Sequence, residues 1–469
     1  MKKILLLSAM AAMLGMSASA AIDNQKYEPM NGINIANQWV LDRIHTPDAW
    51  NKLEANNTRA RTAVMLGDVI YVSRSEAKAV IIGNDTISQS VVYRFNAKDG
   101  SQLPDLDITL NGAPYGTFLG VNCIGADNFG HLWVMPYTSE NTANVPFYAL
   151  NAETGELTLL ATLPKGDDIQ RTDYGDVMGD IFCEQAGCHI MTVGTNASTV
   201  YRWDLFSDGS VEGGFEGDTY LTITDFYPES VTQWGYGPTV KMCLDPYADD
   251  PYAGELFYVD GFSSQPILYD ITGTMIDNFE GVDPKLAQIE VGANGCAEFT
   301  LDDRSFLVYT VAQYSGWDEK LEMNRACQAN ICELGQDMEI ETMSKYWTVP
   351  ANGLGTTSDG GNRVACFSVA YGEEGGEECV TLFVFKCYNG MGVYKIGKGV
   401  KPSEIIDPVY PKGDVNGDKK VDVEDVNTLI NILIGKDAAG KYAGRADVDE
   451  DEKVDVGDIS ALVNIMLGQ

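Results

Sequence analysis

Short apolar runs alternate with turn residues over residues 60–397, and this pattern predicts β-strands rather than helices. The runs are rich in Val, Ile, Tyr and Phe, and Gly, Asp and Asn separate them. Branched and aromatic side chains favour extended backbone, while the separating residues favour turns. An apolar period of three to four residues is not sustained in this part of the chain. We therefore expect an all-β domain.

Two strand patterns recur here at intervals of roughly 50–70 residues. The pattern that usually carries a central Tyr lies at 92–96, 147–151, 200–204, 268–271 and 393–396, with 332–334 as a degenerate copy. A more apolar strand precedes each copy, at 70–72, 132–134, 190–193, 256–259, 306–308 and 382–384. Six such cycles of about four strands predict a β-propeller.

The two ends of this region indicate how the ring closes. The sixth cycle ends near Ile396 after three strands, and an isolated strand-like segment, 38–44, precedes the first cycle. If that segment completes the last blade, the ring has no open edge. Residues 39–42 also resemble the Tyr-containing strand, so six or seven blades remain possible.

The C-terminal segments 414–435 and 447–468 are near copies, 33 positions apart, and both carry oxygen-bearing side chains at alternate positions. The side chains at loop positions 1, 3, 5, 9 and 12 are Asp414, Asn416, Asp418, Asp422 and Asp425, then Asp447, Asp449, Asp451, Asp455 and Asp458. The main-chain carbonyls of Lys420 and Lys453 would supply position 7. Oxygen ligands at these spacings wrap a calcium ion, so the sequence predicts two Ca²⁺ sites.

Each loop leads into a short amphipathic helix. The apolar positions are Val426, Leu429, Ile430, Leu433 and Ile434, then Ile459, Leu462, Val463 and Met466. Pro408 and Pro411 stand where an EF-hand would have its incoming helix. The paired loop–helix units, Asp at position 12 and the start at 413–418 together resemble a type I dockerin over about 56 residues. The resemblance implies calcium-dependent folding and a cohesin-like protein partner.

The sequence departs from the dockerin pattern at two places. Position 6, usually Gly, is Lys419 and Glu452, which predicts weaker calcium binding. Positions 10 and 11, where the family commonly carries Ser–Thr pairs that recognise cohesin, are 423–424 (Val-Glu) and 456–457 (Val-Gly). We therefore expect poor binding to a cellulosomal cohesin. A different partner and docking onto the chain's own propeller are both open.

The N-terminus has the pattern of a secretory signal. Two lysines precede the apolar run 4–16, and an Ala-Ser-Ala site ends at Ala20. We therefore expect export, to the periplasm, cell surface or medium, without a transmembrane anchor. The formal net charge of −36 argues against nucleic acid as a partner. The expected organisation is a signal peptide (1–20), a propeller (21–397), a Pro-containing linker (398–413) and a dockerin-like module (414–469). This layout resembles secreted multidomain proteins of gut Bacteroidetes.

Ten cysteines in an exported chain raise the possibility of disulfides. However, five are expected on the first strand of successive blades: Cys123, Cys183, Cys243, Cys296 and Cys366. Small buried thiols suit that position near the axis. A hairpin disulfide between Cys183 and Cys188 is the alternative.

Catalytic signatures are few. The chain has three histidines, and no G-x-S-x-G, H-E-x-x-H or P-loop pattern occurs. The Gly- and Asp-rich insertions 164–177, 208–240 and 311–328 carry aromatic side chains suited to stacking on sugars. These are Tyr174, Tyr227, Trp234, Tyr236, Tyr314 and Trp317. The alternative is that these aromatic side chains only hold their own loops in place. Two classes remain: a noncatalytic protein whose propeller binds a glycan or a protein, or a polysaccharide-degrading hydrolase or lyase attached to an assembly. Whether the chain is an enzyme is left open.

Overall fold

The computed structural model divides into two compact units, residues 1–403 and 404–469. The residues whose structure it describes are 20–21, 23, 25–43, 45–46, 49–50, 60–74, 77–82, 85–116, 119–244, 249–283, 294–311, 316–318, 323–325, 328–335, 339–351, 353–354, 364–402, 412–416, 421–436, 445–449, 451 and 453–467.

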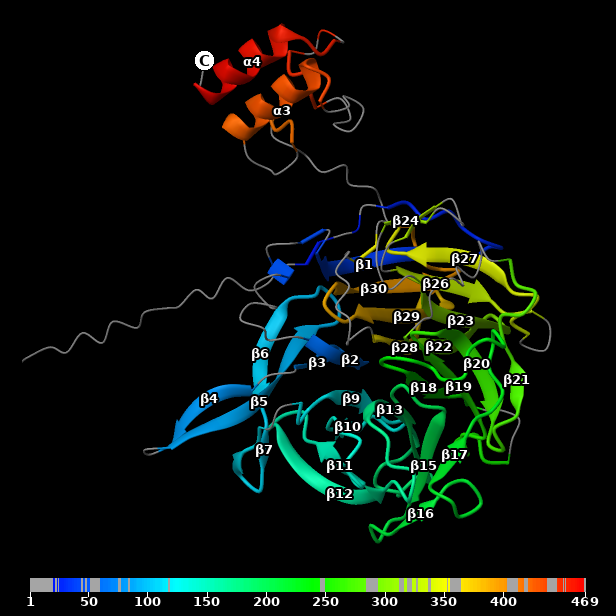
Figure 1. Ribbon diagram of the computed structural model, residues 1–469. Helices are drawn as coiled ribbons and strands as arrows, with labels where there is room; N and C mark the ends of the chain where they lie inside the picture. Colours follow the sequence, from blue (N-terminus) through cyan, green and yellow to red (C-terminus); the bar gives the residue numbers. More distant parts are fainter. Residues whose placement is uncertain are drawn as a thin grey trace, which may run out of the picture. The chain divides into compact units, whose positions relative to one another are not determined.

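The first unit is a six-bladed β-propeller, in which the blades surround one axis (Figure 1). The innermost strands are β2 (Ala60–Leu66), β9 (Cys123–Ala126), β13 (Thr172–Gly179), β18 (Thr239–Met242), β22 (Cys296–Leu301) and β28 (Ala365–Glu374). The second strands are β3 (Val69–Arg74), β10 (Leu132–Met135), β14 (Cys188–Gly194), β19 (Leu256–Gly261), β23 (Arg304–Val311) and β29 (Glu377–Lys386).

Two further strands complete each blade. The third strands are β5 (Asp85–Asn96), β11 (Asn144–Leu150), β15 (Thr199–Leu205), β20 (Ser264–Asp270), β26 (Gln328–Glu333) and β30 (Gly390–Gly397). The outermost strands are β6 (Gln102–Asp107), β12 (Glu156–Pro164), β16 (Val211–Gly213), β21 (Met275–Asp277), β27 (Ser344–Val349) and β1 (Asn34–Asp42). Additional short strands are β4 (Ala77–Ile82), β7 (Thr109–Leu110), β8 (Ala113–Pro114), β17 (Tyr220–Thr222), β24 (Gly316–Asp318) and β25 (Met323–Arg325). The prediction of a propeller is confirmed, and the blade number is six.

The N-terminal strand closes the ring. β1 pairs antiparallel with β30, so the last blade is made from both ends of the domain. The strand spans Asn34–Asp42, beginning four residues before the predicted segment. The Trp39 indole, 2% exposed, also donates a hydrogen bond of 2.8 Å to the Ala97 carbonyl of the first blade. Closure of this kind pairs a strand edge that would otherwise be open.

The hydrophobic core lies in the layers between neighbouring blades. One layer joins Val64, Val92 and Leu106 of the first blade to Ile124 and Val134 of the second. Equivalent layers lie between the third and fourth, fourth and fifth, and fifth and sixth blades. Because each strand of a blade faces a neighbouring blade on both sides, both faces are apolar near the axis. This explains why the strands appear in the sequence as short continuous apolar runs.

The second unit contains α3 (Val423–Leu433) and α4 (Val456–Met466). Its apolar cluster has Val415, Leu429, Ile432, Ala446, Val448 and Leu462 at the centre. Among the described residues, no helix is long and apolar enough to cross a membrane.

One cysteine assignment was wrong. Cys183 does not lie on an innermost strand, because β13 ends at Gly179 and Cys183 follows in a turn with φ of 55°. Cys123, Cys296 and Cys366 lie on innermost strands as predicted, and Cys243 directly follows β18. All nine cysteines within the described residues are free thiols.

Candidate functional site

A cavity of about 530 Å³ lies on the propeller axis and is lined by residues of all six innermost strands. The strands run in the same direction around it. On the neighbouring strands β2 and β28, for example, Ala63 N contacts Cys366 Sγ at 3.5 Å and Met65 N donates to Ser368 Oγ at 3.0 Å. One end of the cavity therefore collects the starts of the strands, and the other collects their ends.

Four charged residues line the cavity, and each has partners: Asp127, whose contacts are given below, and Asp176, Lys241 and Glu298. Lys241 Nζ lies 2.9 Å from Asp176 Oδ1, while Asp176 Oδ2 accepts a hydrogen bond from Met242 N at 2.8 Å. Glu298 Oε1 accepts a bond of 2.6 Å from the Tyr258 hydroxyl. Burial raises the pKa of Glu298, although hydrogen bonds from Tyr258 and the Cys243 thiol oppose the shift.

Two buried polar groups that line the cavity lack such partners. Tyr174 is 3% exposed and Trp133 is 2% exposed. Among the described residues, none forms a hydrogen bond with the Tyr174 hydroxyl or with the Trp133 indole nitrogen. Buried polar groups are ordinarily paired, so each of these two retains an unused capacity for a hydrogen bond.

The four predicted aromatic residues whose side chains are described do not form one surface. Tyr174 lies in β13 rather than in a loop, and Trp234 is 0% exposed and packs against Phe226 in the core, so its ring cannot stack on a ligand from solvent. Tyr227 is partly buried, whereas Tyr236 is 49% exposed. Tyr314 lies outside the described residues. Trp317 lies in β24, and its side chain is likewise not described.

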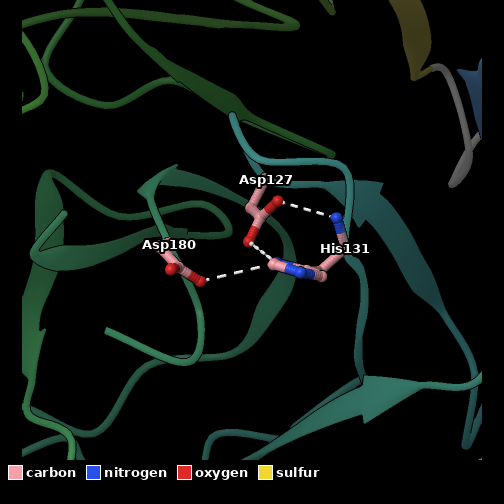
Figure 2. Close-up of side chains that lie close together, drawn as sticks. All are labelled: Asp127, His131 and Asp180. Carbon is pink, nitrogen blue, oxygen red and sulfur yellow. Dashed lines mark hydrogen bonds and ion pairs between the residues drawn. The ribbon is translucent and has the colours of Figure 1, made fainter. Parts of the chain in front are cut away.

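A cluster of Asp127, His131 and Asp180 at the second and third blades has the residue types of a metal site (Figure 2). Its carboxylates also accept hydrogen bonds from backbone amides. Asp127 Oδ1 accepts from Phe129 N and His131 N, and Asp127 Oδ2 accepts from Ile181 N.

The neighbouring carboxylate is engaged in the same way. Asp180 accepts from the amides of Phe182, Glu184 and Gln185 at 2.9–3.0 Å. His131 Nδ1 lies 2.9 Å from Asp127 Oδ2. This arrangement fixes two turns and ties the third blade to the second, and we interpret it as structural.

In the C-terminal unit, position 9 of each predicted loop is the N-cap of a helix. Asp422 accepts a bond of 2.8 Å from Glu424 N before α3, and Asp455 accepts one of 2.6 Å from Gly457 N before α4. A carboxylate at this position satisfies free amides of the first turn and favours helix formation. The two loops thus enter their helices in the same way.

Position 12 ties each loop to its helix. Asp425 is 0% exposed and accepts from Val415 N at 2.8 Å, Asn416 N at 3.0 Å and Asp422 N at 2.9 Å. Asp458 is 1% exposed and accepts from Val448 N, Asp449 N and Asp455 N in the same pattern. These repeated contacts show that the two sequence copies are also structural copies.

Carboxylates converge in the second loop. Asp447, Asp449 and Asp451 each have an oxygen within 4.8 Å of the other two. Desolvation raises the pKa of Asp449, and the charges of Asp451, Asp458 and Asp447 raise it further. Such crowding of like charges fits a divalent cation bound by oxygen. In the first loop Asp414 is 1% exposed and Asn416 is partly buried, while Asp418 and Lys420 lie outside the described residues.

Residues 412–467 match the family of the dockerin type I domain. The C-terminal unit contains a dockerin type I domain. Domains of this type bind calcium and, in general, cohesin partners. The predicted resemblance is confirmed, and the carboxylates described above fit the cation.

The comparison with solved structures concerns the propeller. A DUF4623 family protein from Bacteroides eggerthii aligns with a TM-score of 0.52 at 14% identity, over 82% of this chain and 88% of that one. A proposed 6-phosphogluconolactonase from Bacteroides uniformis aligns with a TM-score of 0.32 at 14% identity, over 68% of this chain and 92% of that one. The first match supports only the fold, and the TM-score of the second match is too low to support any argument. No curated protein matches the chain.

The dockerin domain exposes apolar side chains on both helices. On α3 and its C-cap these are Val423 (61%), Ile430 (40%) and Ile434 (59%), and on α4 and its C-cap Val456 (69%), Val463 (38%) and Leu467 (66%). The two sets are 33 positions apart and follow helical spacing. Each helix therefore presents the same apolar stripe.

Proposed function

We propose that this is an exported two-domain protein in which a dockerin domain, folded around two calcium ions, docks a glycan-binding propeller onto a protein partner. The dockerin match carries the docking half of the proposal. The axial cavity, with its unpaired hydroxyl and indole groups, supports the binding half. The signal-like residues 1–20 support export.

Each calcium ion would be held by one loop. The first set is Asp414, Asn416, Asp418, Asp422, Asp425 and the Lys420 carbonyl, and the second is Asp447, Asp449, Asp451, Asp455, Asp458 and the Lys453 carbonyl. The ion would supply positive charge among otherwise repelling carboxylates, so binding and folding should be coupled. The carboxylates at position 12 would also hold the start of each loop to its helix, as their contacts with backbone amides show.

The docking partner should present an apolar surface. Val423 and Val456 stand at loop position 10 and are well exposed. They cannot exchange hydrogen bonds with a surface built for hydroxyl side chains, and unpaired groups there would cost about 1–3 kcal/mol each. We therefore expect no nanomolar binding in a pull-down of the calcium-loaded protein with a cellulosomal type I cohesin. Val423→Ser with Val456→Ser should improve whatever weak binding exists. Nanomolar binding by the natural sequence would contradict this specificity.

Glycan binding by the propeller can be tested by affinity electrophoresis of the full chain in gels that contain single polysaccharides. We expect at least one neutral polysaccharide to retard the protein, because the cavity offers hydrogen-bonding groups suited to hydroxyls. Retardation should persist in EGTA, since the dockerin loops are not part of this site. Unchanged mobility across the panel would contradict the proposed role.

A polysaccharide-degrading enzyme is the second candidate, and one observation favours it. Glu298, whose pKa is raised by burial, and Asp176, which is paired with Lys241, line the same cavity. Two carboxyl groups in different environments are what acid–base cleavage of a glycosidic bond requires. Release of reducing ends from a retarding polysaccharide, abolished in Glu298→Gln, would establish this candidate over noncatalytic binding.

A further inference from the structure

The axial cavity opens at the end where the innermost strands finish. At the starts of the strands, the lining residues Thr62, Tyr174 and Val364 are each at most 3% exposed. Near the ends, the lining residues Leu244 and Tyr371 are 51% and 56% exposed. A molecule therefore enters from that face. The exposed Tyr236 precedes β18 and belongs to the opposite face.

The cavity offers hydrogen-bond donors that the protein leaves unused. The Tyr174 hydroxyl and the Trp133 indole N–H have no protein partner among the described residues. The Lys241 ammonium carries three N–H donors; it donates to Asp176, and its side chain is 40% exposed. These groups would suit a ligand that is rich in oxygen acceptors.

The charges of the cavity argue for an uncharged ligand. Lys241 is neutralised by Asp176, and Glu298 is held by the Tyr258 hydroxyl. An anionic ligand would meet the carboxylates of Asp127, Asp176 and Glu298, whereas a cationic ligand would meet the Lys241 ammonium. A neutral polyol can accept from the donors and still donate its own hydroxyl protons to the carboxylates.

Two tyrosines, Tyr371 and Tyr252, are among the residues that line the cavity near its open end. The Tyr371 hydroxyl is held by Thr300 N at 3.1 Å, so the exposed ring is fixed in place. Tyr252 also lines the cavity, and its ring packs against Phe129 with centroids 5.3 Å apart. Fixed aromatic faces beside polar groups suit the alternating apolar and hydroxyl faces of a sugar ring.

We propose that the axial cavity binds the end of an uncharged oligosaccharide, which enters past Tyr371 and Tyr252 and reaches Tyr174 at the closed end. This inference rests on the proposed glycan-binding role of the propeller, and it names the site and the ligand class. The volume of about 530 Å³ lies within the range of small-molecule sites. The face concerned is opposite to the one that carries Tyr236.

The test is calorimetry of the full chain with cellotriose, xylotriose, mannotriose and maltotriose, and with trigalacturonate as the charged comparison. At least one neutral trisaccharide should bind. Tyr371→Ala removes the stacking ring and Tyr174→Phe removes only the hydroxyl, and each should weaken that binding about tenfold. Tyr236→Ala is the matched control, a similarly exposed tyrosine on the other face, and should change the affinity less than about twofold.

Thermal melting separates binding from folding. Tyr174→Phe should melt no lower than the natural protein, because the hydroxyl has no protein partner to lose. Weakened binding by Tyr236→Ala but not by Tyr371→Ala or Tyr174→Phe would overturn this site and leave glycan binding intact. If no trisaccharide binds but polysaccharides still retard the protein, the site is overturned and the proposed glycan binding is kept. Tighter binding of trigalacturonate would overturn the ligand class. Loss of both trisaccharide binding and retardation would overturn the proposed role as well.

Discussion

Replacing Asp127 with Asn tests whether the Asp127–His131–Asp180 cluster stabilises the contact between the second and third blades or binds a metal. In Asp127→Asn, the remaining oxygen can keep the amides of Phe129 and His131, while the new NH₂ group faces the amide of Ile181. Ile181 is 1% exposed, so its N–H would lose its partner without gaining water. An unpaired buried amide costs about 1–3 kcal/mol. The free energy of unfolding should fall by that amount.

His131→Asn is the matched control for this change. The His131 side chain is 34% exposed, and an Asn amide can still donate to Asp127. We expect a loss below about 1 kcal/mol. Equilibrium urea unfolding, followed by tryptophan fluorescence, measures both variants. Equal losses of unfolding free energy in the two variants would contradict this structural role. A rise in the unfolding midpoint with Zn²⁺ that either substitution abolishes would show that the cluster binds metal after all.

Three further predictions follow from individual side chains. Asp425→Asn places an amide beside the N–H of Asp422 and removes a calcium ligand, so calorimetry of the isolated unit 404–469 should show calcium binding weakened more than tenfold. Glu424→Gln makes the same chemical change one residue earlier and should not weaken binding. Equal effects of the two substitutions would contradict the ligand assignment. Burial raises the pKa of Cys366 to about 12 and that of Cys123 further. N-ethylmaleimide should therefore modify the turn residue Cys183 first, and Cys366 and Cys123 only after denaturation. Mass spectrometry that finds most of the inner-strand cysteines in disulfides would refute this prediction. Burial raises the pKa of Asp260 from 3.8 to about 7, so the folded state binds the proton more tightly than the unfolded state does. The contribution of Asp260 to stability therefore falls as pH rises from about 4 to 7, by at most about 1.4 kcal/mol per pH unit. Asp260→Asn keeps a neutral side chain of the same shape beside Thr239 and Gly295, so it should flatten this dependence in unfolding measured at several pH values, and an unchanged slope would contradict the prediction.

The blades were predictable because their signal is local. Each strand carries its own apolar run and its own turn residues, and the sequence repeats them six times. The closing strand β1 was also recognisable, although it begins at Asn34 rather than Gln38. Cys183 was misplaced because a regular cysteine spacing was extended through the third blade. There the innermost strand carries Gly175 and Asp176, and the chain turns before Cys183.

The axial cavity was not predicted, because its residues come from six strands that are distant in the sequence. A signal was present nonetheless. Lys241 and Glu298 lie on strands whose other residues are mostly apolar, and charged residues are seldom placed there without a role. The aromatic residues of the insertions were misleading as candidates for ligand binding. The burial of Trp234 beside Phe226 depends on tertiary packing, which local composition does not encode. The dockerin domain was predictable because its repeated pattern lies within one short segment.

Calorimetric titration of the calcium-free full chain with Ca²⁺ tests the central claim most directly. The account predicts two ions per chain, and one ion when either Asp414 or Asp447 is changed to Ala. Removal of the bound calcium with EGTA should abolish the helical signal of the unit 404–469 in circular dichroism. Absence of calcium binding, or a helical signal that EGTA leaves unchanged, would contradict the account of the dockerin domain as a calcium-dependent docking module.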